Sequence, residues 1–166
     1  MAITYEPIAT TTLGSALSTI SFTSISGSYT DLILVFVGAQ TNNAQGDLQF
    51  RFNSDTGSNY SRTILSGNGT TASSNRSSSV TFFRGEATSY PDTVDGGTVQ
   101  ILQLMDYSNT TTYKTVLFRG NSAASGTDAT VGLWRSTSAI TAIECYIDTG
   151  TLKSGSMFTL YGVLAA

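Results

Sequence analysis

The chain has 166 residues, a formal net charge of −3 at pH 7 and a charged fraction of only 11%. It contains no histidine, the side chain that titrates nearest neutrality and most often ligates metals, so general-base chemistry and zinc sites are hard to assemble. The eight basic residues are scattered singly, and no basic amphipathic segment occurs. We therefore expect neither a nucleic-acid partner nor a membrane partner.

Most apolar segments are short, rich in β-branched or aromatic residues, and ended by Gly, Asn, Asp or Ser, a composition typical of strands. In chain order, the sequence predicts ten strands at 19–25, 31–39, 47–53, 60–65, 79–84, 98–107, 113–119, 129–134, 140–148 and 156–164. Helical periodicity is hard to find, so long helical crossovers between parallel strands are excluded. The fold class predicted is all-β, a single antiparallel β-sandwich domain over residues 1–166, of jelly-roll type.

Two strands carry a clear burial pattern. In 47–53 the alternation places Leu48, Phe50 and Phe52 inward and Gln49 and Arg51 outward. The segment 31–39 is almost continuously apolar, which predicts a strand covered on both faces.

The segments between the strands predict loops and ends. Residues 66–79 and 120–130 are predicted to be polar or small-residue loops. Residues 1–12 are predicted to be extended, either as an arm that pairs with another subunit or as a frayed terminus. The C-terminal segment stays apolar to its last residue, which favours a strand tied into a sheet or a contact with a neighbour.

Few residues offer chemistry. Asn53, Asp55, Ser58 and Asn59 bring oxygens together, but a single carboxylate in their loop favours a self-capped turn over a calcium site. Asp92 and Asp95 are interpreted in the same way, as turn formers. The lone cysteine, Cys145, alternates with isoleucines and is predicted to lie in the core. We predict no catalytic, cofactor-binding or metal-binding residue, no cofactor, and no enzymatic activity.

Several aromatic residues lie near predicted strand ends, where exposed rings could stack on sugars or enter a protein interface. These residues are Tyr29, Tyr60, Tyr90, Tyr107, Tyr113 and Trp134. The sequence alone does not decide between sugar binding and a protein interface for these residues.

Four segments together resemble a known group of proteins. Residues 25–36, 48–61, 132–143 and 155–163 read ISGSYTDLILVF, LQFRFNSDTGSNYS, GLWRSTSAITAI and GSMFTLYGV. This pattern resembles small virion structural proteins of tailed bacteriophages, including cyanophages, of the capsid decoration (cement) or tail-associated β-sandwich type. The resemblance spans roughly residues 20–163 and carries no functional residue from one position to another.

The resemblance implies a non-enzymatic virion protein made in the host cytoplasm. The expected role is a capsid decoration protein on the outer capsid surface, which binds and stabilises the lattice of the major capsid protein. Low charge and an apolar C-terminus favour a homo-oligomer, with a trimer expected. The alternative is a receptor- or glycan-binding module of a phage tail fibre or tail-associated protein.

Overall fold

The computed structural model describes residues 5–42, 45–85, 91, 93 and 97–164. These residues form twelve strands and no helix, so this part of the chain has no helix that could cross a membrane. The strands are β1 (Tyr5–Thr12), β2 (Thr19–Phe22), β3 (Asp31–Gly38), β4 (Leu48–Phe52), β5 (Tyr60–Gly67), β6 (Ala72–Val80), β7 (Phe83–Arg84), β8 (Thr98–Leu104), β9 (Lys114–Ser122), β10 (Gly126–Trp134), β11 (Ile143–Ile147) and β12 (Met157–Val163).

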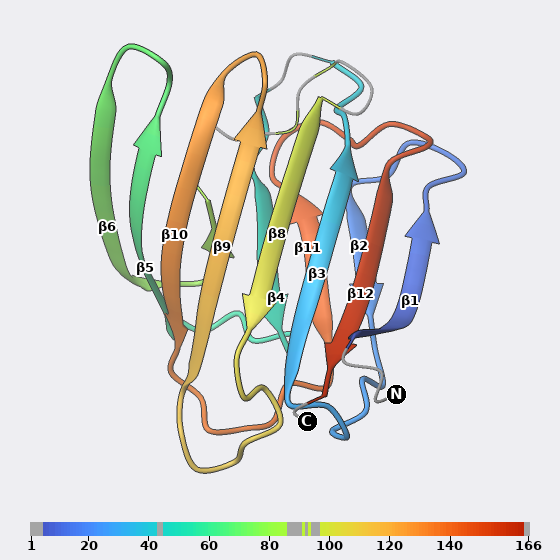
Figure 1. Cartoon of the computed structure of the whole chain (residues 1–166), viewed down its shortest axis with the longest axis vertical. Coiled ribbons are helices and arrows are strands. Elements are labelled where there is room, and N and C mark those ends of the chain that lie inside the picture. The colour runs from blue at the N-terminus through green and yellow to red at the C-terminus, as the bar shows by residue number, and fades with distance from the viewer. Residues whose placement is uncertain (1–4, 43–44, 86–90, 92, 94–96, 165–166) are drawn as a thin grey trace.

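The strands form two antiparallel sheets that pack face to face. The large sheet has eight strands in the order β1-β12-β3-β8-β9-β10-β5-β6, and the small sheet has four in the order β2-β11-β4-β7. In Figure 1 the large sheet faces the viewer, and β4, β11 and β2 lie behind β8, β3 and β12. Non-consecutive neighbours mean that the chain crosses repeatedly between the sheets. The predicted antiparallel β-sandwich of jelly-roll type is therefore confirmed.

Alternating side chains from both sheets fill the core. On β4, Phe50 and Phe52 point inward and are fully buried, as the alternation predicts. The Phe50 ring lies 5.9 Å from the ring of Phe118 on β9, which joins the two sheets. Gln49 points outward as expected, but it is only 5% exposed and is therefore a covered position.

Strand β3 departs from its prediction. Its inward side chains Leu32 and Leu34 are buried, whereas the outward side chains Ile33, Val35 and Val37 are only half-buried. The expectation that both faces of this strand are covered is wrong. The small sheet packs on the inward side of the large sheet, and no strand of the described residues packs on the outward side. The apolar outward residues instead belong to the outer face of the large sheet.

Two predicted loops are mostly strand. Residues 72–80 form β6, which pairs with β5, and residues 114–134 form the β9–β10 hairpin, whose turn spans only 123–125. Serine and threonine composition pointed to loops, but hydrogen bonding to a neighbouring strand stabilises both segments. Strand β1 occupies 5–12 and pairs antiparallel with β12 of the same chain, and β12 lies between β1 and β3. Residues 157–163 of the C-terminal segment are thus a strand tied into the sheet, as one of the two expectations had it.

Candidate functional site

The aromatic residues do not form an exposed platform. Tyr60, Tyr107 and Trp134 are almost completely buried, so the expectation that they are exposed near strand ends is wrong. The Tyr60 and Trp134 rings stack at 6.4 Å inside the core. Tyr113 is exposed, Tyr29 is half-buried, and Tyr90 lies outside the described residues. The large apolar area of the rings explains why the core takes them in preference to the surface.

The turn after β4 is organised by Asp55. Its carboxylate accepts hydrogen bonds from Trp134 Nε1 at 2.7 Å, from Asn59 Nδ2 at 2.9 Å and from the backbone N–H of Gly57 at 2.8 Å. Partial burial alone would raise the pKa of Asp55, but the bonds from Trp134, Asn59 and Gly57 lower it below its ordinary value. The predicted self-capped turn is confirmed, and Asp55 serves to connect the turn to β10.

The other candidate groups have structural surroundings. Cys145 is fully buried, as predicted, and burial followed by the nearby Glu144 raises the pKa of its thiol far above the ordinary value. Lys114 is buried and donates from Nζ to the carbonyl oxygens of Thr112 and Thr137. Asp92 and Asp95 lie outside the described residues. Within the described ranges, no three His, Cys, Asp or Glu side chains gather closely enough to hold a metal ion.

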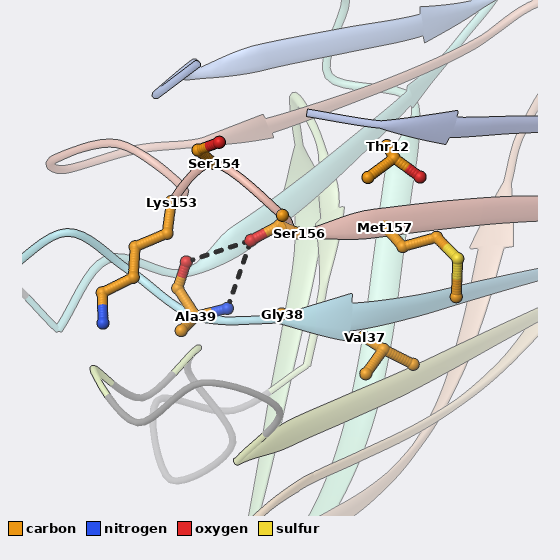
Figure 2. Close-up of a pocket in the computed structure, with 9 residues that line it drawn as sticks. Thr12, Val37, Gly38, Ala39, Lys153, Ser154, Ser156 and Met157 are labelled. Carbon is orange, nitrogen blue, oxygen red and sulfur yellow. Dashed lines mark hydrogen bonds between the residues drawn. The ribbon is translucent and has the colours of Figure 1, made fainter. Parts of the chain in front are cut away.

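One cavity lies where β3 ends and β12 begins. It has a volume of about 340 Å³, and Figure 2 shows Ser156 between Lys153 and Met157 at its wall. The Ser156 hydroxyl donates to the Ala39 carbonyl and accepts from the Ala39 N–H, both at 3.3 Å. Lys153 is the ionisable side chain among the described residues that line it, and its Nζ donates to the Thr93 carbonyl. The described residues around this cavity include no acid–base pair, and the two Ser156–Ala39 hydrogen bonds connect the end of β3 to the start of β12.

The outer face of the large sheet carries a larger apolar depression, a groove of about 590 Å³ across β9, β10 and β5. We call the outward-facing residues of β5, β9 and β10 along it the aliphatic face: Thr63, Leu65, Leu117, Arg119, Ala129 and Val131. Gln103 on β8 and Ser74 on β6 lie at its two sides.

Strand register builds the aliphatic face in two rows. Leu117 lies opposite Val131 on the neighbouring strand, and Ala129 lies opposite both Arg119 and Leu65. Leu65 is 61% exposed, Val131 47% and Leu117 41%. Because successive residues of a strand point to opposite faces, the same strands send Phe118 and Trp134 into the core.

The outer face of the small sheet is different, and we call its outward residues Gln49, Arg51, Glu144 and Tyr146 the polar face. Arg51 forms an ion pair with Glu144 at 3.6 Å, and its guanidinium lies 4.5 Å from the Tyr146 ring centroid. Gln49 Nε2 donates to Asp148 Oδ2 at 2.9 Å. Arg51, Glu144 and Gln49 are therefore paired within the chain, whereas the buried Tyr146 hydroxyl has no hydrogen-bond partner among the described residues.

Sequence reasoning did not identify the aliphatic face. Its available signal was the outward series in the β9 and β10 segments, where Leu117 and Val131 occupy positions that alternation assigns to solvent. Single exposed aliphatic residues are ordinary in proteins, so only the strand order, which brings them together, makes them a surface.

No family model matches the chain, and no curated protein sequence matches it. Among solved structures, a variant of the alginate lyase Aly36B in complex with an alginate tetrasaccharide is similar at a TM-score of 0.36 and 9% identity, over 95% of this chain and 81% of that one. Mouse laminin alpha1 chain, domains LG4-5, is similar at a TM-score of 0.35 and 14% identity, over 93% of this chain. This chain spans 41% of the laminin chain. At these TM-scores, neither likeness carries an argument about function.

Proposed function

We propose that this chain is a non-enzymatic structural protein of a tailed-bacteriophage virion. Its role is that of a capsid decoration (cement) protein that binds and stabilises the major capsid protein lattice. The observation that carries the proposal is the aliphatic face, with Leu65, Leu117 and Val131 all exposed on adjacent strands. Contiguous exposed apolar surface is a feature of protein interaction sites. The resemblance of the sequence to phage virion proteins supplies the partner.

The stabilisation follows from linkage. A protein that binds only the assembled lattice stabilises it by RT ln(1 + [L]/Kd), about 4 kcal/mol per site at a thousandfold excess over Kd. A specific interface buries about 800 Å² on each partner, which is roughly a tenth of the 7726 Å² accessible surface of this chain. The aliphatic face and its surroundings supply an apolar centre for such a contact.

Oligomerisation adds to this mechanism. The proposal includes a homotrimer, because three linked copies that meet three equivalent lattice sites bind more tightly than one copy does. Light scattering on the purified protein tests this part, with a mass near three times 17.5 kDa expected. A monomer at high micromolar concentration would contradict the trimer but not the binding to the lattice.

Copy number and location test the proposed role. A capsid decoration protein contacts many equivalent sites, so we expect hundreds of copies per particle and antibody label over the whole head. Removal of the chain should leave adsorption to cells intact and lower the temperature at which heads release DNA. Label confined to tail tips, few copies and failed adsorption would reject the capsid role and favour the receptor- or glycan-binding alternative. The burial of Tyr60, Tyr107 and Trp134 removes three of the six aromatic rings on which that alternative relied, while Tyr113 stays exposed.

A further inference from the structure

We infer that the aliphatic face binds an apolar segment of a protein partner that carries a carboxylate, and that Arg119 is the residue that pairs with this carboxylate. The inference rests on the proposed function, since the capsid lattice is the protein expected to supply the segment. It adds the binding face and the chemistry of the partner.

The first observation is how the basic residues are engaged. Arg51 and Arg84 form ion pairs with Glu144 and Asp47. Lys114, Arg135 and Lys153 donate to carbonyl oxygens. The guanidinium of Arg62 lies 5.5 Å from the ring centroid of Phe82. Arg76 and Arg119 make no hydrogen bond or ion pair with any residue that the structure describes. Both lie on the outer side of the large sheet. Arg76 is on the edge strand β6, and Arg119 is on β9 within the aliphatic face.

The second observation is the surroundings of Arg119. Its cross-strand neighbours are Ile101 on β8 and Ala129 on β10, and Leu117 precedes it on the same face of β9. Strands β5, β8, β9 and β10 are described in full, and none of their outward positions is acidic. Arg119 is thus a cation set among aliphatic side chains, on a chain whose net charge is −3.

These observations fix the chemistry of the partner. Any partner that covers Leu117 and Val131 also removes water from the guanidinium of Arg119. A charge taken out of water without a counterion costs far more than the apolar contact gains. The partner must therefore bring an anion, and a carboxylate matches the planar, bidentate geometry of the guanidinium group.

Two other occupants fit less well. A second copy that packed its own aliphatic face against this one would cover Arg119 of both copies, and the outward positions of β5, β8, β9 and β10 offer no acid to pair with either guanidinium. A glycan would need aromatic rings and several polar groups, whereas the outward residues of β5, β9 and β10 include no aromatic side chain. The aliphatic lining favours a protein.

The experiment measures binding of the purified chain to heads that lack it, by sedimentation over a range of concentrations. The variants are Arg119→Glu, Arg119→Lys and, as a control on the small sheet, Ser21→Glu, which adds a charge at an exposed position of β2. Each variant is first checked for a wild-type denaturant midpoint. Arg119→Glu should weaken binding by about tenfold or more, while Ser21→Glu should stay within about twofold of wild type. Arg119→Lys keeps the charge without the planar fork and should fall between them.

The outcomes separate the inference from the proposed function. Wild type that fails to bind heads overturns both. If Arg119→Glu binds heads as tightly as wild type does, the inference alone is overturned, because another face must then make the contact. Binding of wild type to immobilised alginate, lost in Arg119→Glu, together with no binding to heads, would replace the protein segment by an anionic glycan. Tight wild-type binding that weakens with added salt, and a smaller salt effect in Arg119→Glu, supports the carboxylate pair.

Discussion

The two outer faces of this sandwich handle charge in opposite ways. On the polar face, Arg51 is neutralised by Glu144 and Gln49 is bonded to Asp148, so the chain itself satisfies these groups. On the aliphatic face, Arg119 lies among exposed aliphatic residues, and none of the outward positions on strands β5, β8, β9 and β10 is acidic. The charged groups of the polar face thus have counterions or polar partners within the chain, whereas Arg119 would gain a counterion only from the proposed partner.

The largest expected difference is between the loss of stability caused by a core substitution and that caused by a substitution on the aliphatic face. Phe50→Ala removes a ring packed against Phe83 and Phe118, and we expect a loss of about 3–5 kcal/mol in the free energy of unfolding. Leu117→Ala removes an exposed side chain and should cost less than about 1 kcal/mol, while it weakens binding to heads. Denaturant melts and sedimentation of both variants measure the two quantities. Equal stability losses would show that Leu117 belongs to a core.

The next effect concerns the turn that connects the two sheets. Asp55→Asn replaces one carboxylate oxygen by an amide NH₂ group, so the bonds from Trp134 and Asn59 to Oδ2 and the bond from the Gly57 N–H to Oδ1 cannot all persist. We expect a loss of about 1–3 kcal/mol in urea melts near pH 7. Thr56→Ala in the same turn is the control and should change the free energy of unfolding by less than about 0.5 kcal/mol.

The same variant has a pH signature. The pKa of Asp55 is lower in the folded chain than in the unfolded one, so the unfolded state binds a proton first as the pH falls. The stability from its ionised form is therefore present above about pH 4 and is lost as the pH falls through the folded pKa. The stability gap between wild type and Asp55→Asn should narrow between pH 6 and pH 3. A gap that stays constant would show that Asp55 does not titrate as described.

Smaller effects should arise on the polar face. Gln49→Ala leaves Asp148 without its side-chain partner at a covered position, and we expect a loss of about 1 kcal/mol. This exceeds the value below about 0.5 kcal/mol that an exposed outward residue would give. Chemical denaturation decides between the two values.

The smallest effect should come from the exposed ion pair. Arg51→Ala should cost under about 1 kcal/mol, because a partly exposed pair at 3.6 Å is screened by water. It should leave binding to heads unchanged. A large loss of binding in Arg51→Ala would mean that the polar face, too, contacts a partner.

Alternation and turn chemistry predicted much of the fold. The inward Phe50 and Phe52, the buried Cys145 and the self-capped turn at Asp55 all follow from local sequence, because each depends on a residue and its near neighbours. Strand β6 did not follow, since six of its nine residues are Ser or Asn, and its hydrogen bonds to β5 stabilise it as a strand.

The aliphatic face could not be predicted from local sequence, because it too depends on long-range strand pairing. Leu65, Leu117 and Val131 are far apart in sequence and meet only through the strand order β9-β10-β5. Trp134 and Tyr60 are likewise buried because the small sheet covers the ends of the strands that carry them. Periodicity assigns a residue to one face of its strand, but long-range pairing decides what that face meets.

The most direct test of the account is a cryo-EM map of the intact particle at a resolution that shows side chains. We expect many copies of the chain on the outer capsid, with the aliphatic face against the major capsid protein, a carboxylate of that protein beside Arg119, and the polar face in solvent. Density for the chain at tail tips, or copies on the head that present the polar face to the capsid and leave Leu117 and Val131 in water, would contradict it.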